Sequence, residues 1–304
     1  MDSVSGEYVH DFPPFIRVHK NGEIERLFVA GDDIPAGFDP VSGVETIDVL
    51  VIPETNVKAR IFIPKSDDPD AKFPLIVHYH GGGFCIGSPY SPFANNFLTS
   101  FASYAQTLIV SIDYRLAPEH PLPIAFDDSW AALQWIASHS NGQGPEPVLN
   151  TKVNFNRVFL AGESAGANIA HNMAVRIGTS GLPGLVPIGA IILHPYFPNQ
   201  EPDKLIEFLY PGSNCLEDNP ILSPKSDPNL KKMACKKVLI TVASEDYLKP
   251  RGISYFETLK HVDWDGAVEL KEDEGGDHCF FAFEQVSEKF KLFMENMATF
   301  IKQE

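Results

Sequence analysis

Two kinds of hydrophobic pattern divide the chain. In the first part, apolar and polar residues alternate in short runs. The stretch Ile16 to Val29 (IRVHKNGEIERLFV) holds two such runs on either side of Asn21-Gly22, a strong hairpin signal. A second pair of runs covers Thr46–Ile52 and Val57–Pro64. Residues 1–64 are therefore expected to form an N-terminal β segment.

From Phe73 onward, continuous apolar runs alternate with amphipathic stretches. The expected strands are Leu75–Tyr79, Leu108–Asp113, Val158–Ala161, Ala190–Leu193, Val238–Val242 and Ala267–Lys271. The expected helices cover about Phe93–Ala105, Ile124–Ser138, Ala165–Ile177, Arg251–His261 and Glu284–Ile301. This alternation predicts an α/β fold with a mostly parallel central sheet covered by helices on both faces.

The chain shows no linker between two domains, so residues 1–304 are expected to form a single domain. The least regular stretch, about 198–224, is rich in Pro, Asn and Asp and is expected to be a short cap over the sheet. In sheets of this type, functional sites lie at the carboxyl ends of the strands.

The chain is strongly acidic, with 24 Lys and Arg against 40 Asp and Glu and a net charge of −16. Such a surface repels phosphate backbones and anionic lipids, so we expect neither nucleic acid nor membrane as a partner. No apolar run approaches the length of a membrane span, and the opening MDSVSGEYVHDFPP has no apolar region typical of a signal peptide. The four cysteines form no C-x-x-C pair, which favours reduced thiols in the cytoplasm.

A serine stands between an expected strand and an expected helix. Gly162-Glu-Ser-Ala-Gly166 fits the pattern G-x-S-x-G, in which glycines allow a sharp turn that presents the serine. The N–H groups at the start of the following helix favour negative charge beside the hydroxyl. This placement makes Ser164 a candidate nucleophile and not merely part of a turn.

A second glycine motif, His80-Gly81-Gly82-Gly83, follows the apolar strand LIVHY. The backbone N–H groups of Gly82 and Gly83, together with that of Ala165, are expected to bind a developing oxyanion. The alternative is a flexible surface turn, but the presence of both glycine motifs in this order favours the oxyanion loop.

An acyl-transfer triad also needs a base and an acid, in the chain order Ser, Asp, His for this architecture. Asp246 follows the apolar run VLITVA, and His278 lies in the loop GGDHCF after the last strand. Glu245 and Asp277 are alternative acids. Asp246 is favoured because of its place at the strand end, whereas Asp277 is too close in sequence to reach the ring of His278 easily.

Several other polar residues have plausible structural roles. Four histidines lie near strand ends or early in a helix and are interpreted as structural: His78, His80, His171 and His194. Cys279, beside the candidate base, is expected to be a packing residue. Arg115 and Glu119 are expected to form an ion pair that supports their loop. Neither a metal-binding spacing nor a dinucleotide motif is present, so we expect no metal and no cofactor.

Five motifs in this order resemble the plant class I carboxylesterases, in the hormone-sensitive-lipase-like branch of the α/β-hydrolases. They are HGGGFCIGS, DYRLAPEHPLP, GESAGAN, SEDYLKPRG and GGDHCF, and the opening FPPFIRVHKNGEIERL also resembles that family's N-terminal segment. The resemblance implies an α/β-hydrolase fold and cytoplasmic hydrolysis of small esters. It also implies Ser164, Asp246 and His278 as triad and an oxyanion hole from the HGGG loop and Ala165.

The same family contains proteins that are not hydrolases. Gibberellin receptors resemble these enzymes but lack the catalytic histidine, leguminous hydroxyisoflavanone dehydratases carry threonine at the nucleophile, and some alkaloid cyclases have an altered triad. Here Ser164, Asp246 and His278 are all present, which favours an esterase acting on small, fairly apolar esters. A lyase or cyclase of specialised metabolism that uses the same pocket stays the alternative, and a small-molecule receptor is a third.

The pocket itself is harder to predict. Phe84, Ile86, Tyr90 and Tyr247 lie near the motifs and are candidates to line a hydrophobic pocket. The stretch from His194 to Pro220 is shorter than the family's usual cap. This shortness predicts either a more open pocket or a lid supplied by the N-terminal segment.

Overall fold

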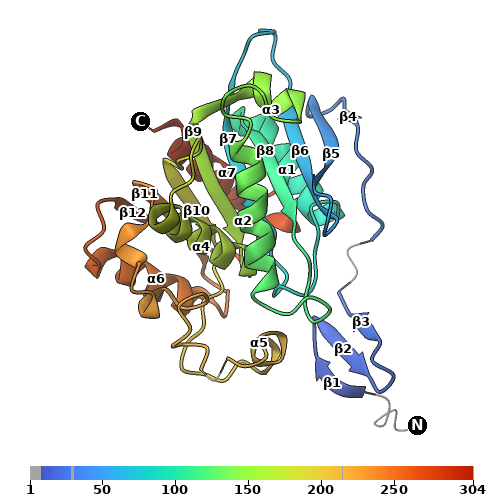
Figure 1. Ribbon diagram of the computed structural model, residues 1–304, viewed down its shortest axis with the longest axis vertical. Coiled ribbons are helices and arrows are strands. Elements are labelled where there is room, and N and C mark those ends of the chain that lie inside the picture. Colours follow the sequence, from blue (N-terminus) through green and yellow to red (C-terminus); the bar gives the residue numbers. More distant parts are fainter. Residues whose placement is uncertain (1–7, 29–30, 214, 304) are drawn as a thin grey trace.

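The computed structural model describes residues 8–28, 31–213 and 215–303, and a nine-stranded sheet forms its centre (Figure 1). The strand order is β12-β11-β10-β9-β7-β8-β6-β5-β4. The strands are β4 (Phe38–Asp39), β5 (Val44–Ile52), β6 (Val57–Pro64), β7 (Phe73–Tyr79), β8 (Leu108–Asp113), β9 (Val153–Glu163), β10 (Gly189–Leu193), β11 (Lys237–Ala243) and β12 (Ala267–Asp273). Strands β7 to β12 are mutually parallel, whereas β4, β5 and β6 add an antiparallel edge, which confirms the predicted mostly parallel sheet.

Helices cover both faces of this sheet, as the sequence predicts. The α-helices are α1 (Pro92–Ala105), α2 (Ile124–Ala137), α3 (Pro147–Lys152), α4 (Ala165–Ser180), α5 (Lys204–Leu209), α6 (Lys249–His261) and α7 (Glu288–Lys302). In Figure 1, α2 and α4 lie in front of the sheet, and α1 and α7 lie behind it. Leu133, Ile169 and Tyr255 anchor α2, α4 and α6 in one core, while Phe97 and Phe293 anchor α1 and α7 in the other.

A small three-stranded sheet at the N-terminal end of the chain lies apart from the main sheet (Figure 1). Its strands are β1 (Tyr8–Phe12), β2 (Ile16–His19) and β3 (Ile24–Arg26), paired antiparallel in that order. The hairpin predicted around Asn21-Gly22 is confirmed, because Gly22 takes a positive φ of 87° in the turn between β2 and β3. Val29, the last residue of the predicted pair, lies outside the described residues.

The sequence pattern missed the shortest elements. Helices α3 and α5 and the 3-10 helices η1 (Pro224–Ser226), η2 (Leu230–Lys232) and η3 (Phe280–Ala282) are too short to show a helical period. Within the expected cap, α5 begins where the Asp203 side chain accepts a hydrogen bond from the backbone N–H of Ile206. Similarly, α7 begins after Ser287, whose hydroxyl caps the helix, and not at Glu284.

None of the helices within the described residues is both long enough and apolar enough to cross a membrane. Helices α1, α2, α6 and α7 instead bury one side against the sheet and leave the other to solvent, whereas α4 is buried on nearly all sides from Ala165 to Ile177. The carboxyl ends of β7, β9, β11 and β12 lie along one edge of the parallel sheet, and each is followed by one of the motifs singled out in the sequence.

Candidate active site

Ser164 occupies the sharp turn between β9 and α4. Its backbone has φ 53° and ψ −118°, a conformation that non-glycine residues rarely adopt and that costs about 1–3 kcal/mol. The glycines of the motif allow the close approach that this turn needs. A Cβ atom at Gly162 would lie 2.3 Å from the carbonyl oxygen of Gly166, and one at Gly166 would lie 2.0 Å from that of Tyr79. Any larger residue at either position would displace the strand or the helix.

The structure brings the three residues of the expected triad into one hydrogen-bonded chain. His278 Nε2 lies 3.0 Å from Ser164 Oγ, and His278 Nδ1 lies 2.7 Å from Asp246 Oδ2. The other oxygen of Asp246 accepts a hydrogen bond of 2.7 Å from the backbone N–H of Leu248, and the residue is only 4% exposed. Asp246 is therefore held so that it orients the imidazole with its Nε2 toward the serine hydroxyl.

The two alternative acids do not face the imidazole ring. Glu245 is exposed, and its carboxylate accepts a hydrogen bond of 3.5 Å from the hydroxyl of Ser244. Asp277 is also exposed, and its carboxylate accepts a hydrogen bond of 2.6 Å from the backbone N–H of His278, not from the ring. This geometry agrees with the preference for Asp246 drawn from the sequence.

Cys279 lies closer to the site than its packing role alone requires. Its Sγ is 3.6 Å from His278 Nε2, although it also packs against the core between the sheet and α7. Burial lowers the pKa of His278, but negative charge on Cys279 and the hydrogen bond to Asp246 outweigh burial, so the pKa is raised above its usual value. For the Cys279 thiol the two effects have the opposite signs. Burial raises its pKa, but the positive charge of His278 outweighs the effect of burial, so the pKa of the thiol is lowered.

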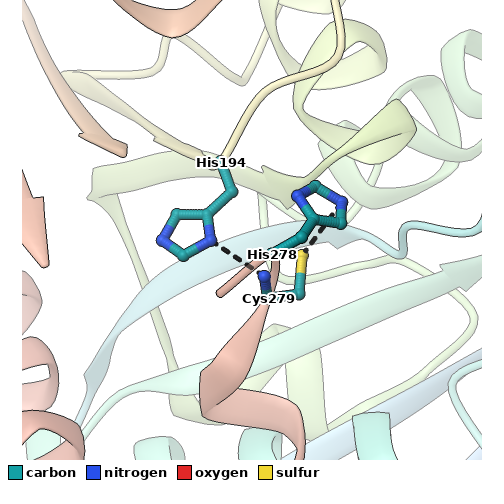
Figure 2. Close-up of side chains that lie close together, drawn as sticks. All are labelled: His194, His278 and Cys279. Atoms are coloured by element: carbon teal, nitrogen blue, oxygen red, sulfur yellow. Dashed lines mark hydrogen bonds between the residues drawn. The ribbon is translucent and has the colours of Figure 1, made fainter. Parts of the chain in front are cut away.

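Figure 2 shows His194, His278 and Cys279, the one group of potential metal ligands found within the described residues. One nitrogen of His194 accepts a hydrogen bond of 2.9 Å from the backbone N–H of Cys279, and the other donates to Asp273 at 3.1 Å. His194 therefore has no lone pair left for a metal, and the two remaining groups fall short of the four ligands of a typical zinc site. The cluster instead fixes the loop that carries His278.

The glycine loop after β7 turns its backbone toward the same place. Gly82 has a φ of 109°, and a Cβ atom there would lie 2.2 Å from the carbonyl oxygen of Ile86. Within the described residues, the backbone N–H groups of Gly82 and Gly83 have no hydrogen-bond acceptor. Ala165 adds an N–H group from the first residue of α4, where the helix leaves such donors unpaired. These groups are placed to receive an oxyanion.

Glu163, which sequence reasoning did not consider, connects the nucleophile turn to the glycine loop. One carboxylate oxygen accepts a hydrogen bond of 2.8 Å from the backbone N–H of Gly81, and the other lies 2.7 Å from His78 Nε2. His78 in turn contacts Ser111 at 2.9 Å. Burial raises the pKa of Glu163, but His78 and Gly81 outweigh burial and lower it, which keeps the carboxylate charged. The signal available in the sequence was an acid beside the nucleophile in G-x-S-x-G.

Two of the other histidines are structural, as predicted. The ring of His80 stacks on Tyr114 at 4.2 Å, and its Nδ1 bonds to the carbonyl oxygen of Gly81 at 2.8 Å. His171 bonds to the hydroxyl of Tyr255 at 2.8 Å. Burial lowers the pKa of His80 to about 4 and that of His171 to about 3, so both stay neutral at physiological pH.

Arg115 and Glu119 do not form the expected ion pair. Arg115 makes a two-pronged contact with Asp128 of α2, at 2.8 and 2.9 Å. Glu119 makes a similar contact with Arg26 of the N-terminal sheet, at 2.8 and 2.9 Å. The expectation was wrong because each residue has its partner outside the loop, on α2 for Arg115 and in the N-terminal sheet for Glu119, which local spacing does not reveal.

Two cavities meet at Ser164. The larger, of about 560 Å³, is bounded by His278, Cys279, the glycine loop and several aromatic residues of α1 and the segment after η3. The smaller, of about 370 Å³, is bounded by Gly83, Tyr196 and residues of α5. Phe15 and Tyr247 line both cavities, so the N-terminal sheet forms part of the site.

The residues expected to line the pocket divide into two groups. Ile86 and Tyr247 do line the larger cavity. Phe84 is instead fully buried and packs near Phe126, and Tyr90 lies under the guanidinium of Arg60 at 4.8 Å. Closeness to a motif in the sequence did not predict which side chains line the cavity, because successive residues of a loop point in different directions.

Comparison with known proteins agrees with this geometry. Residues 76–282 match the model of a family described as alpha/beta hydrolase fold. The chain is 39% identical to "Probable carboxylesterase 1" of Arabidopsis thaliana over 100% of this chain and 99% of the relative. It is 38% identical to the 2-hydroxyisoflavanone dehydratase of Glycyrrhiza echinata, over 98% of each chain.

Solved structures share the fold at lower identity. An esterase of Pyrobaculum calidifontis superimposes with a TM-score of 0.70 at 23% identity, covering 85% of this chain and 84% of its own. A thermostable esterase of Pseudomonas putida gives a TM-score of 0.71 at 21% identity, covering 88% and 85%. Fold, family match and full-length relatives agree with the resemblance drawn from the motifs. The chain belongs to the α/β-hydrolase family, in the hormone-sensitive-lipase-like group that contains the plant carboxylesterases.

Proposed function

We propose that this protein is a serine carboxylesterase that hydrolyses small, fairly apolar esters through an acyl-enzyme on Ser164. The observation that carries the proposal is the unbroken hydrogen-bonded chain from Asp246 through His278 to Ser164, next to unpaired N–H donors and a cavity. The plant relatives named as carboxylesterases, which match almost the whole chain, support it.

In the proposed first half-reaction, His278 Nε2 takes the proton of the Ser164 hydroxyl as its oxygen attacks the ester carbonyl. The carbonyl oxygen becomes negative and receives hydrogen bonds from the N–H groups of Gly82, Gly83 and Ala165. Asp246 holds the imidazole and stabilises its charged form. His278 then gives the proton to the leaving alcohol oxygen, and the acyl group stays on Ser164.

In the second half-reaction, water enters the place of the alcohol. His278 takes a proton from the water, the resulting hydroxide attacks the acyl carbon, and the same N–H groups bind the new oxyanion. The carboxylic acid leaves as the proton returns to Ser164. Every group in this cycle is supplied by the chain, so we expect no cofactor.

Replacing the nucleophile tests the proposal. With p-nitrophenyl acetate and butyrate as substrates, Ser164→Ala should lower kcat by about 10³-fold or more, because the acyl-enzyme no longer forms. Ser138→Ala, an exposed serine at the end of α2, is the matched control and should keep full activity. Equal turnover by Ser164→Ala and the wild type would rule out the proposed mechanism.

A lyase or cyclase reaction is the second candidate, favoured by the relative named 2-hydroxyisoflavanone dehydratase. The same His278 would remove a proton from carbon, and a leaving group would depart without an acyl-enzyme. Product analysis by mass spectrometry separates the two: hydrolysis gives an acid and an alcohol, whereas elimination gives an unsaturated product. A small-molecule receptor is the third hypothesis. A receptor would not convert its ligand, and Ser164→Ala would bind that ligand as the wild type does.

We further propose a cytoplasmic location. The four cysteines, Cys85, Cys215, Cys235 and Cys279, are all free thiols, which suits a reducing compartment. One relative carries the word mitochondrial in its name, so a fluorescent fusion of the full chain is the appropriate test.

A further inference from the structure

The two cavities at Ser164 are chemically different. Both contact Ser164, but only the larger is also lined by His278 and Cys279, while the smaller lies on the side of Gly83 and Leu248. The oxyanion of a bound ester must face the N–H groups of the glycine loop. The two remaining substituents of the ester carbon then point to opposite sides, one toward each cavity.

The position of His278 decides which part of the ester goes where, if the proposed esterase mechanism holds. The proton that leaves Ser164 on His278 Nε2 must reach the oxygen of the departing alcohol. That oxygen must therefore lie within hydrogen-bonding distance of His278. Since His278 lines only the larger cavity, the alcohol part occupies the larger cavity and the acyl part the smaller one.

Aromatic side chains dominate the outer wall of the larger cavity. Phe28, Phe93 and Phe283 come from three separate segments, and their ring centres lie 4.6 to 6.3 Å apart. Phe28 remains 41% exposed and Phe283 53% exposed, although both line the cavity. At these distances the three rings contact one another, and together they offer an aromatic surface on which a further ring can pack.

The smaller cavity favours a different chemistry. Two carboxylates, of Asp11 and Asp203, line it together with apolar residues of α5. Each already has a cationic neighbour behind the wall: Arg17 lies 2.9 Å from Asp11, and Arg251 lies 4.0 Å from Asp203. The hydroxyl of Tyr196 donates to Asp203 at 2.9 Å. No Lys or Arg is among the described residues that line the cavity, so an acyl group with its own carboxylate would lose hydration there without gaining a cationic partner.

We propose that the substrates are esters in which an aromatic alcohol is joined to an uncharged carboxylic acid whose acyl group fits the smaller cavity of about 370 Å³. The aromatic ring of the alcohol packs against the cluster formed by Phe28, Phe93 and Phe283. The acyl group points toward Gly83 and Tyr196. This inference rests on the proposed esterase function and adds the orientation of the ester to it.

Two isomeric esters test the orientation directly. 2-Naphthylmethyl acetate and methyl 2-naphthylacetate contain the same atoms and the same kind of alkyl ester, with the ester group reversed. We expect kcat/KM to be at least about tenfold higher for 2-naphthylmethyl acetate, a ratio typical of a pocket that accepts one shape over another. 2-Naphthylmethyl hydrogen succinate, with an anionic acyl group, should be a poorer substrate than the matching butyrate.

Variants of the aromatic wall link the preference to the cavity. Phe283→Ala and Phe28→Ala should each lower the ratio between the two isomers several-fold, chiefly by raising KM for 2-naphthylmethyl acetate. Val286→Ala is the control, because Val286 is 93% exposed close to Phe283 in sequence but does not line the cavity. Thermal melting of each variant confirms that it is folded.

The outcomes separate the two proposals. Equal rates, or a preference for methyl 2-naphthylacetate, would overturn the orientation and leave the esterase standing. So would an isomer ratio that is unchanged in folded Phe283→Ala and Phe28→Ala. Failure to hydrolyse both isomers together with p-nitrophenyl acetate would overturn the esterase function itself. Slower hydrolysis of the butyrate than of the hydrogen succinate would overturn the assignment of an uncharged acyl group.

Discussion

At the scale of single residues, most contacts of the site converge on His278. Its Nε2 lies 3.0 Å from the serine oxygen and 3.6 Å from the sulfur of Cys279, so two groups that can lose a proton face one base. A negative charge on Cys279 favours the protonated imidazole, and a protonated imidazole is unable to act as a base. The cysteine therefore contributes, together with Asp246, to the raised pKa of the base.

Replacing Cys279 should move the pH dependence of activity. Because Cys279 raises the pKa of His278, Cys279→Ala should lower that pKa, and the rising limb of kcat/KM against pH should shift to lower pH. The measurement is the pH profile of p-nitrophenyl acetate hydrolysis by the wild type and by the variant. Cys215→Ala, an exposed cysteine, serves as the control. A profile of Cys279→Ala that coincides with the wild type would contradict this account.

The residues that were predictable at this scale are those whose chemistry is tied to a local motif. Ser164 was predictable because the glycines around it permit one unusual turn. Asp246 was preferred over Glu245 by its place at a strand end. Glu163 was missed because its partners, His78 and Gly81, belong to another strand and its loop. The spacing of residues along one segment does not show which side chains will pair across a sheet.

At the scale of elements, Arg26 ties the N-terminal sheet to the rest of the molecule. Its guanidinium contacts both carboxylate oxygens of Glu119, at 2.9 and 2.8 Å, and its Nε donates to the carbonyl oxygen of Cys85 at 2.9 Å. Cys85 belongs to the loop that follows the glycine motif. The contact thus joins the sheet that carries Phe15 to the loop that borders the larger cavity.

Loosening this contact should affect substrate binding more than chemistry. We expect Arg26→Ala to raise KM for 2-naphthylmethyl acetate several-fold with a smaller change in kcat, because Phe15 and Phe28 would be held less firmly. The exposed position of the pair limits its contribution to stability to about 1 kcal/mol. Kinetics and limited proteolysis near residue 28 provide the measurement. Lys236→Ala, which breaks an exposed pair with Asp265, is the control and should change neither.

Elements were predictable in proportion to their length and regularity. All six parallel strands and the five long helices were expected within a few residues, since continuous apolar runs and helical periods identify them. Strand β9 begins at Val153, well before the predicted Val158, because the polar residues Asn154, Asn156 and Arg157 interrupt the apolar run. The position of the N-terminal sheet against the cavities was left open as one of two alternatives, because it depends on contacts between distant segments.

At the scale of the whole molecule, the charge of −16 surrounds a site whose smaller cavity also contains two carboxylates. Such a field raises the local concentration of cations and lowers that of anions, and added salt weakens it. The effect on a neutral ester is negligible. The dependence of kcat/KM on ionic strength therefore separates the effect of the protein's electric field on substrate binding from the effect of cavity shape.

A charged ester and its neutral counterpart make this measurable. The kcat/KM for acetylcholine should fall several-fold as salt is added at neutral pH, whereas that for 3,3-dimethylbutyl acetate, which has the same shape without the charge, should stay nearly constant. The comparison holds acyl group and size fixed. A parallel response of both esters would show that salt acts on the fold or the solvent and not through the charge.

The sequence separation between Ser164 and His278 also has a consequence for the order in which the site forms during translation. In the proposed mechanism the base for Ser164 is His278, which lies 114 residues further along the chain, in the loop after β12, a strand at the edge of the sheet that pairs with β11. A nascent chain that has finished α4 already carries the nucleophile turn but has no base. Esterase activity would thus first appear when the ribosome has released the final strand, so that the enzyme stays silent until its synthesis is nearly complete.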